Sequence, residues 1–341
     1  MAPKSAPEDP DEALRAWLVG HVDGVDDTSI ETELISGGHS NVTIGVRIGE
    51  RELVVRRPPA TAFLPTANDV GREYRFYSAL HDSAVPTPRV FAFCDDESVI
   101  GAPFYVMERL HGVVPHESAA LEGISAPDAT ALCERFVEVL TAIHDVDYTA
   151  VGLGDVGKPT GYLERQVRRW TDQWHRAKVA DDPVIDELAA ILDAHIPESP
   201  AATIVHGDYR LGNVMLDAAS RRDIVGVFDW EMATIGDPLA DVGYTLLYWG
   251  TTDRPPIHPS QQCAELPGMF SADQLAQRYS VVSGRAVDHV VFYVVLAAFK
   301  LTIIGAGNAA RARRAGAETP AAQSNGVPLA NWALEFWNRG R

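Results

Sequence analysis

The stretch from His206 to Asp217, HGDYRLGNVMLD, places an acid, Asp208, and an amide, Asn213, close together in one short segment. Apolar runs at Thr203 to Val205 and at Val214 to Leu216 flank these polar positions and predict two short strands. A loop between two strands presents its side chains from a fixed turn. The sequence therefore predicts a polar functional site in this loop.

The spacing of His206, Asp208 and Asn213 matches the ends and centre of the H-R-D-L-x-x-x-N catalytic loop of protein kinases. The apolar run Ile224 to Phe228 then leads to Asp229, at the place where kinases carry a metal-binding Asp. Phosphoryl transfer needs a group that orients or deprotonates the attacking hydroxyl, and oxygen ligands that hold Mg²⁺ on the ATP phosphates. We therefore predict Asp208 as the catalytic base and Asn213 and Asp229 as metal ligands.

The strings HGDYRLGNVMLD and FDWEMATIGDPLADVG together resemble the aminoglycoside phosphotransferase and choline kinase superfamily, and within it the branch fused to acyl-CoA dehydrogenases in animals. The resemblance runs from about Leu34 to the C-terminal helices. It implies an α+β, bilobal, protein-kinase-like fold, with a small antiparallel sheet in the N-terminal lobe and a mainly helical C-terminal lobe. It also implies that Asp241 accepts hydrogen bonds from backbone N–H groups of the catalytic loop. Asp237 stands directly before Pro238 and is expected to cap a helix.

The predicted lobes divide the chain after residue 110, and a length of 341 residues is enough for two of them. Residues 1–110 form the nucleotide-binding lobe, in which residues 1–10 are expected to be disordered because they are rich in proline and acids. Residues 111–341 form the helical lobe with the catalytic loop and the substrate site.

Composition argues against several classes of function. A formal net charge of -18 opposes nucleic-acid binding, which needs a basic surface. The three cysteines, Cys94, Cys133 and Cys263, form neither a disulfide framework nor a zinc signature. The N-terminus has no apolar signal, and the apolar run Val290 to Phe299 suits a buried core helix better than a membrane span. We expect a cytoplasmic protein without nucleic-acid or membrane partners.

A strand, a loop of small residues and a second strand follow one another early in the chain. The runs Glu31 to Ile35 and Val42 to Ile48 predict the strands, and SGGHSN joins them. Such a loop can close backbone N–H groups over phosphates, although a plain hairpin turn would have the same pattern. The candidate nucleotide contacts in this loop are Gly37, Gly38, His39 and Ser40.

A third predicted strand, Glu52 to Arg56, ends where kinases carry a Lys that contacts the α- and β-phosphates. Arg56 stands at this position, and the next predicted helix, Asp69 to His81, offers Glu73 as its ion-pair partner. Arginine can bind phosphate through two parallel hydrogen bonds, so both residues are candidates for the nucleotide site. A solvated strand end and an ordinary helical acid are the alternative.

Two more strands, Arg89 to Cys94 and Pro103 to Arg109, follow that helix. The second ends in YVMERLHG, which resembles the hinge of the family. The resemblance implies that backbone groups around Met107, Glu108 and Leu110 meet adenine, with Met107 near the ring. Met107 could equally be a core residue.

From Gly112 onward the pattern is mostly helical. One more short helix is predicted near the N-terminus, before the first predicted strand. Trp170 and Trp174 fit core packing better than a substrate pocket, since burial is the default for aromatic residues. A flexible surface loop is predicted at Asn308 to Val327. The predicted helices are Asp11 to Val19, Ala126 to His144, Tyr162 to Lys178, Asp186 to His195, Asp273 to Ser280, Val287 to Ile304 and Leu329 to Asn338.

The expected activity is transfer of the γ-phosphoryl group of ATP, with Mg²⁺, to a hydroxyl group of a small molecule. The resemblance leaves several acceptors open, among them aminoglycosides and, in the fused branch, hydroxyacyl-CoA compounds. In the latter case the arginines of the long helix could steer an acidic acceptor. These arginines are Arg165, Arg168, Arg169 and Arg176.

Trp230 and Glu231 replace the Phe-Gly that follows the metal-binding Asp of protein kinases, and Glu231 could add a carboxylate. Two alternatives stay open. A nucleotide-binding pseudokinase with a regulatory role would keep the fold, although Asp208, Asn213 and Asp229 are all present. A His/Asp metallohydrolase would need more ligands near His206, and the eleven histidines are scattered.

Overall fold

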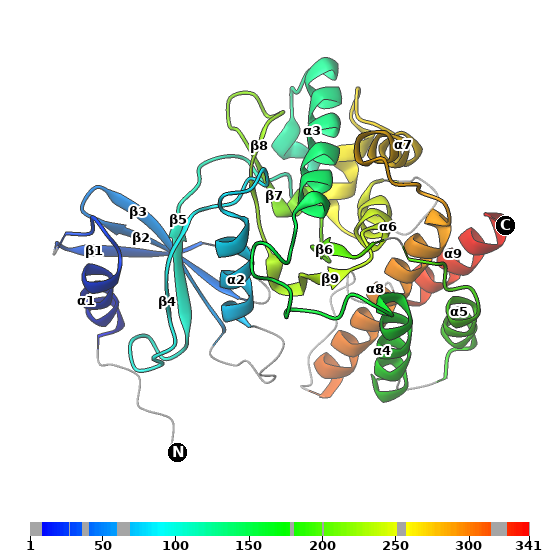
Figure 1. Ribbon diagram of the computed structural model, residues 1–341, viewed down its shortest axis with the longest axis horizontal. Helices are drawn as coiled ribbons and strands as arrows, with labels where there is room; N and C mark the ends of the chain where they lie inside the picture. Colours follow the sequence, from blue (N-terminus) through cyan, green and yellow to red (C-terminus); the bar gives the residue numbers. More distant parts are fainter. Residues whose placement is uncertain are drawn as a thin grey trace. The chain divides into compact units, whose positions relative to one another are not determined.

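The computed structural model describes residues 9–26, 28–35, 41–59, 69–177, 181–199, 201–250, 257–314 and 326–340. The chain divides into two compact units (Figure 1). The first unit comprises Met1–His111 with Val225–Ala233, and the second comprises Gly112–Ile224 with Thr234–Arg341. The sequence prediction had one boundary, after residue 110, and no counterpart to the return of Val225–Ala233 to the first unit.

The first unit is built on a five-stranded antiparallel sheet with the strand order β1-β2-β3-β5-β4. Successive side chains of a strand point to opposite faces, so the sheet has two apolar surfaces to cover. Helix α1 covers one face and α2 covers the other (Figure 1). The elements are α1 (Pro10–His21), β1 (Ile30–Ile35), β2 (Val42–Ile48), β3 (Arg51–Arg57), α2 (Val70–Leu80), β4 (Val90–Cys94) and β5 (Phe104–Glu108).

The two faces of the sheet can be followed along β3 and β5. Val55 and Val106 belong to the cluster that packs on Leu14 and Leu18 of α1. Tyr105 lies on the other face, with its ring centroid 6.0 Å from that of Tyr77 in α2. Helix α1 begins at Pro10, which falls inside the segment predicted to be disordered, while residues 1–8 lie outside the described chain.

The returning segment Val225–Ala233 is anchored to α2 by Trp230, whose side chain is fully buried. The indole ring is stacked on Phe76 at a centroid distance of 5.9 Å and meets Tyr77 edge-on. Its Nε1 donates to the carbonyl oxygen of Val227 at 3.1 Å. This packing fixes the position of the residues that flank Trp230.

The second unit is mainly helical, as predicted, and contains short strands around the catalytic loop. β6 pairs with β9, a strand that the sequence analysis missed because its three residues, Thr234–Gly236, show no alternation. The helices are α3 (Ala126–Asp145), α4 (Tyr162–Ala177), α5 (Pro183–Ala194), α6 (Leu239–Tyr248), α7 (Ala272–Ser283), α8 (Val290–Arg314) and α9 (Gly326–Arg339). The short elements are η1 (Ser118–Leu121), β6 (Thr203–Val205), η2 (Leu211–Asn213), β7 (Val214–Leu216), β8 (Ile224–Val227), η3 (Trp230–Met232) and η4 (Pro259–Glu265).

Helix α8 is the central helix of the second unit. Residues Val290–Ala310 are long and apolar enough to span a membrane, but 61% of the most apolar window is buried, and α8 packs on α4, α6 and α9. This is the packing of a core helix, as predicted. The helix also corrects the predicted loop from Asn308, because it continues to Arg314; its last residues, AARARR, are strong helix formers.

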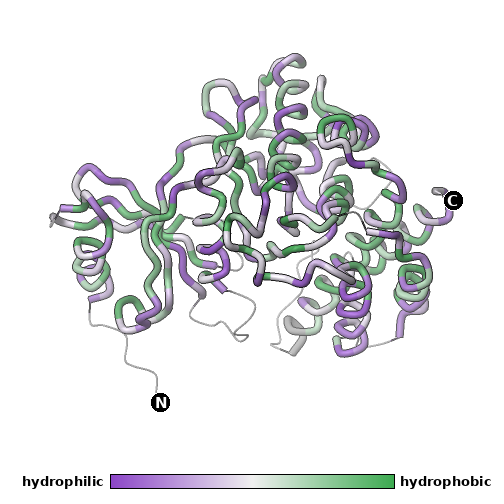
Figure 2. Tube along the Cα trace, in the orientation of Figure 1, coloured by the Kyte–Doolittle hydropathy of each residue, from purple (hydrophilic) through white to green (hydrophobic). Residues whose placement is uncertain are grey.

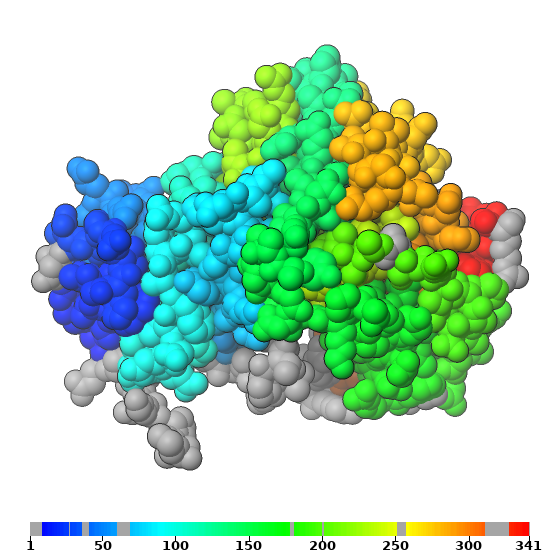
Figure 3. All heavy atoms as spheres, viewed as in Figure 1, coloured from blue at the N-terminus to red at the C-terminus, as the bar shows by residue number. Residues whose placement is uncertain are grey.

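Helices α4 and α5 lie side by side on the visible face of the second unit, in green in Figure 3. Figure 2 shows that α4 is largely hydrophilic along its length, whereas its buried residues form one narrow stripe. Trp170 and Trp174 belong to this stripe and are each 4% exposed. Their indole nitrogens donate to Gln166 at 3.2 Å and to Asp186 at 2.8 Å, so both tryptophans pack in the unit as predicted.

Candidate active site

The catalytic loop of the second unit leaves β6 at His206 and is held by a buried carboxylate. Asp241, in the first turn of α6, accepts hydrogen bonds from the backbone N–H groups of His206 at 2.6 Å and Gly207 at 2.7 Å. His144 of α3 contacts the same carboxylate at 3.3 Å, and its other ring nitrogen lies 2.7 Å from the hydroxyl of Tyr279. The predicted role of Asp241 is confirmed.

The environment of Asp241 keeps its carboxylate ionised. Burial alone would raise the pKa of Asp241, but the hydrogen bond and charge of His144, together with His206 and the N–H of Gly207, lower it below the ordinary value. A buried carboxylate that accepts several N–H groups is stabilised in its charged form. The loop is therefore fixed at its start by a charge-assisted pair of hydrogen bonds.

Asp237 lies one residue before Pro238, which is the N-cap of α6, and its side chain still binds the first N–H of the helix. Its Oδ1 accepts from the N–H of Leu239 at 2.9 Å, and its Oδ2 accepts from the hydroxyl of Tyr293 at 2.8 Å. Burial raises the pKa of Asp237 above its ordinary value despite these bonds. The start of α6 is thus tied to α8, and the helix that supports the loop has a fixed position.

Asp208 and Asn213 are in direct contact, as their spacing predicted. The amide nitrogen of Asn213 donates to the carbonyl oxygen and to Oδ2 of Asp208, each at 2.8 Å. Because these bonds use the amide nitrogen, the amide oxygen of Asn213 is the atom that could bind a cation. The side chain of Asp208 is 19% exposed, so solvent or a substrate can reach it.

Arg210 is a site residue that the sequence analysis missed. Its Nε donates to Oδ1 of Asp208 at 3.2 Å, and its guanidinium carbon lies 5.4 Å from the ring centroid of Tyr248. The signal was available, since Arg210 lies inside the HGDYRLGN string two residues after the acid. Asp208 thus carries an arginine on one carboxylate oxygen and an asparagine on the other.

Two further groups near the loop have shifted acidities. Burial raises the pKa of the Tyr244 hydroxyl well above its usual range, with Asp208 acting in the same direction. Burial lowers the pKa of His258 to about 4, and the charges of Arg210 and His116 add to this effect. Both side chains are consequently neutral near pH 7.

In the first unit, Arg56 and Glu73 form the predicted ion pair. Nε and one terminal nitrogen of Arg56 donate to the two carboxylate oxygens of Glu73, at 2.8 and 3.0 Å. The same guanidinium donates to Asp229 at 3.1 Å and to the hydroxyl of Thr43 at 3.3 Å. Glu73 is fully buried and also accepts from the hydroxyl of Tyr105 at 3.0 Å.

This network determines the charge of Arg56. Burial alone would lower the pKa of Arg56, but the carboxylate of Glu73 leads the groups that raise it well above its usual range, with Tyr105 and Asp229 contributing. Arginine at this strand position therefore stays charged and joins two acids of the unit. A lysine, with one ammonium group, could not form the same parallel pair of hydrogen bonds.

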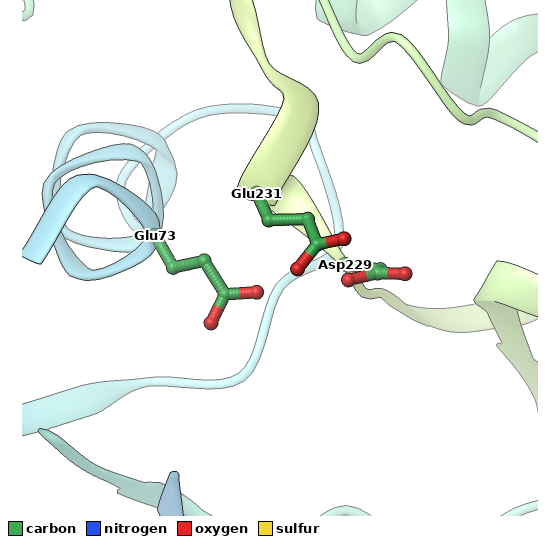
Figure 4. Close-up of side chains that lie close together, drawn as sticks. All are labelled: Glu73, Asp229 and Glu231. Atoms are coloured by element: carbon green, nitrogen blue, oxygen red, sulfur yellow. The ribbon is translucent and has the colours of Figure 1, made fainter. Parts of the chain in front are cut away.

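Three carboxylates of the first unit lie close enough together to hold a metal ion. Carboxylate oxygens of Glu73, Asp229 and Glu231 lie within 4.8 Å of one another. Figure 4 shows Glu73 extending from α2 toward Asp229 and Glu231, which come from the segment after β8. An all-oxygen donor set is the type that Mg²⁺ prefers.

The backbone of Asp229 has an uncommon conformation. Its φ of 70° and ψ of 56° lie in the left-handed region, where non-glycine residues are rare and Asp is among the better tolerated. The buried Trp230 on the next position holds this turn in place. Outliers of this kind concentrate at functional sites, which supports a functional role for Asp229.

The remaining predicted nucleotide contacts are only partly described. Met107 is 4% exposed on β5, opposite Val54 of β3, and the N–H of Glu108 donates to the carbonyl oxygen of Arg89 at 2.8 Å. Leu110 is half-buried. Their predicted contact with adenine stays a prediction, and Gly37, Gly38, His39 and Ser40 lie outside the described residues.

Comparison with known proteins finds similarity across most of the chain. The model of a family described as "Phosphotransferase enzyme family" matches residues 31–275, which include every predicted catalytic and metal-binding residue. Acyl-CoA dehydrogenase family member 10 of Mus musculus is 32% identical over 333 residues, which are 96% of this chain and 31% of that protein. Acyl-CoA dehydrogenase family member 11 of Homo sapiens is 30% identical over 302 residues, 87% of this chain and 38% of that protein. The chain thus spans about a third of the length of these relatives.

Solved structures share the fold over nearly the whole chain. A putative aminoglycoside phosphotransferase from Ralstonia eutropha has a TM-score of 0.82 and 32% identity, and the match covers 96% of this chain and 98% of that one. A thermostable mutant of aminoglycoside phosphotransferase APH(4)-Ia, in a ternary complex with AMP-PNP and hygromycin B, has a TM-score of 0.61 at 19% identity, covering 96% and 99%. The predicted α+β, kinase-like fold is confirmed.

Proposed function

The chain belongs to the phosphotransferase enzyme family, and on that premise we propose that it transfers the γ-phosphoryl group of ATP, with Mg²⁺, to a hydroxyl group of a small molecule. The observation that carries the proposal is the contact of Asp208 with Asn213 in a loop whose backbone is fixed by the buried Asp241. A carboxylate held in this way, yet 19% exposed, suits a base that must meet an outside hydroxyl.

In this proposal Asp208 orients the acceptor hydroxyl and takes its proton on a carboxylate oxygen. The side chains of Asn213 and Arg210 donate to the carboxylate and prevent it from rotating. Holding the reacting group in place lowers the entropic part of the barrier. A regulatory pseudokinase is the alternative, and it would bind nucleotide without needing this arrangement around Asp208.

The residues present fit a magnesium-bound nucleotide. Asn213 and Asp229 would hold Mg²⁺, as their places in the two motifs predict, and Glu231 offers a further carboxylate beside Asp229; the ion would neutralise negative charge on the phosphates. Arg56, kept charged by Glu73, would bind a phosphate oxygen. On this assignment, Asp229→Asn and Asn213→Ala weaken Mg²⁺-nucleotide binding, and an unchanged dependence of nucleotide affinity on Mg²⁺ in both variants would contradict it.

We propose a hydroxyacyl-CoA-type compound as the acceptor and keep an aminoglycoside as the second candidate. The relatives named acyl-CoA dehydrogenases favour the first, and the structural neighbours with aminoglycoside names favour the second. Helix α4 offers the exposed Arg168 and Arg169 to an acidic acceptor, whereas Arg165 donates to the carbonyl oxygens of Lys158 and Thr160. The protein would act in the cytoplasm.

The test is an acceptor panel with ATP. ADP release and product mass are measured with a series of hydroxyacyl-CoA compounds and with kanamycin-like amines, with and without Mg²⁺ and at two salt concentrations. We expect Mg²⁺-dependent phosphorylation of an acyl compound, weakened by salt because charge steers the acceptor. Turnover of the amines alone would replace the first acceptor class by the second. Nucleotide binding without any phosphorylated product would favour the pseudokinase.

A further inference from the structure

We propose that Lys300 of α8 is a positioning residue, whose ammonium group fixes the Gly207–Asp208 peptide and thereby the orientation of the Asp208 carboxylate. This inference rests on the proposed function, because it assigns Lys300 to the same catalytic loop. Lys300 lies 93 positions from Gly207 in the sequence, and the sequence analysis gave it no role.

The contact that carries the proposal is a hydrogen bond to the loop backbone. Nζ of Lys300 donates to the carbonyl oxygen of Gly207 at 2.9 Å. Gly207 has a φ of 82°, in the left-handed region, so the peptide that follows it has an orientation that few other residues would allow. The bond from Lys300 is made to the peptide group that joins Gly207 to Asp208.

Side chains of α6 and α8 hold several of the backbone groups around Asp208. The N–H groups of His206 and Gly207 donate to Asp241, and the hydroxyl of Thr245 donates to the carbonyl oxygen of Tyr209 at 2.8 Å. Between these contacts the carbonyl oxygen of Asp208 accepts from the amide nitrogen of Asn213, and the carbonyl oxygen of Gly207 accepts from Lys300. The N–H of the same peptide, that of Asp208, donates to Nδ1 of His206 at the longer distance of 3.3 Å, so the loss of Lys300 removes the shorter of two bonds that orient this peptide.

Packing alone does not favour a lysine at this position of α8. Lys300 is half-buried and its neighbours Phe299 and Ile303 are fully buried, and transfer of an ammonium group out of water is unfavourable unless it is paired. Burial accordingly lowers the pKa of Lys300, while Asp208 and Asp241 act in the opposite direction. Nζ also lies 4.7 Å from the ring centroid of Tyr244, a cation–π contact that offsets part of the desolvation. A leucine or methionine would fill the space without this penalty.

The surroundings of the ammonium group favour an indirect role. A cavity of about 40 Å³ adjoins it, lined among others by Gly207, Asp241, Tyr244 and Lys300. The hydrogen-bond acceptor that the structure gives the ammonium group is a backbone oxygen of the loop rather than the carboxylate of Asp208. Lys300 therefore acts on Asp208 through the loop, and we assign it no contact with substrate.

The test compares three variants with the wild-type chain and the acceptor that the panel identifies. Lys300→Met removes the charge and the donors at similar length, and we expect kcat to fall roughly 10- to 100-fold, the effect of a small misplacement of a catalytic group. The KM for ATP should change less than about twofold, on the same reasoning that only positioning is lost. Lys300→Arg keeps charge and donors and should recover most of the rate. Lys158→Met, at an exposed lysine outside the site, is the matched control and should behave as wild type.

Amide hydrogen exchange gives a readout that does not depend on turnover. In Lys300→Met, peptides that contain residues 206–209 should exchange faster than in wild type, while the exchange of α6 stays the same. If the wild-type chain phosphorylates no acceptor, the proposed function fails and this exchange measurement still tests the tether. Unchanged kcat in Lys300→Met, or exchange in residues 206–209 equal to that of wild type, overturns the proposal. Equal losses of kcat in the Met and Arg variants would also overturn it, since they would indicate a packing defect.

Discussion

Replacing Arg56 by methionine tests the network that holds Asp229 and Glu73 in the first unit. The substitution removes a guanidinium that is 13% exposed and leaves the fully buried carboxylate of Glu73 without its cation. Tyr105 and Asn41 still donate to this carboxylate, at 3.0 and 3.5 Å, but both are neutral. Breaking a buried ion pair on one side typically lowers the free energy of unfolding by about 3–5 kcal/mol. We expect a loss at the lower end of this range, because two hydrogen bonds to Glu73 remain.

The matched control is Arg47→Met on the neighbouring strand β2. Arg47 pairs with Glu52 at 2.9 Å, almost the same distance, but its side chain is 60% exposed. Exposed pairs contribute little because water and salt screen them, so the unfolding midpoint should hardly move. Comparison of the two variants thus shows whether burial of an ion pair, rather than the distance between its charged atoms, determines how much the pair stabilises the fold.

The assay is unfolding in urea at pH 7, with the loss of stability taken from the midpoint at unchanged slope. A double variant, Arg56→Met with Glu73→Leu, should be more stable than Arg56→Met alone, because no unpaired charge then remains buried. The reasoning is refuted if Arg56→Met moves the midpoint no further than Arg47→Met does. It is equally refuted if the double variant is less stable than the single one.

Two other predictions concern acids and bases of the second unit. Asp241→Asn should lower the free energy of unfolding at pH 7 by about 3 kcal/mol, because it removes the charged acceptor for His206 and Gly207. The pKa of Asp241 is lowered on folding, so its contribution to the free energy of unfolding is fully present above the ordinary value of 3.8 and is lost as the pH falls further. Urea unfolding of both chains at pH 7 and pH 3 checks this. A loss of stability in Asp241→Asn that is equal at the two pH values would contradict it. The pKa of His258 is lowered from 6.5 to about 4, so the unfolded chain binds a proton at this residue before the folded chain does. Its contribution to the free energy of unfolding is therefore fully present above pH 6.5 and is lost as the pH falls toward 4. His258→Gln should flatten the stability profile in this window, and thermal unfolding at half-unit pH steps that gave parallel profiles would count against the assignment.

Much of the fold was predictable because its signals are local. The strand pattern of residues 42–57 and the helix containing Glu73 follow from alternation and from helical spacing, and both lie within a residue or two of their predicted ends. The contact of Asp208 with Asn213 was predictable because one short loop carries both residues. The pairing of Arg56 with Glu73 followed from their order along the chain and the family resemblance.

The missed features depend on contacts between distant segments. Strand β9 is three residues long and exists because β6 is there to pair with it. The return of Val225–Ala233 to the first unit depends on the packing of Trp230 on Phe76, which no local pattern encodes. The bond from Lys300 to the loop also joins segments that are far apart in the sequence. The sequence indicated it only by a charged residue at the end of an apolar run.

The most direct test of the account is phosphoryl transfer by Asp208→Ala with the acceptor that the panel identifies. Loss of a positioned base should reduce kcat by about 10²- to 10⁴-fold, while the affinity for Mg²⁺-ATP stays close to that of wild type. Asp223→Ala, at a 63%-exposed acid 15 positions further along the chain, is the matched control and should keep full activity. Turnover by Asp208→Ala at the wild-type rate would contradict the assignment of Asp208 and, with it, the proposed mechanism.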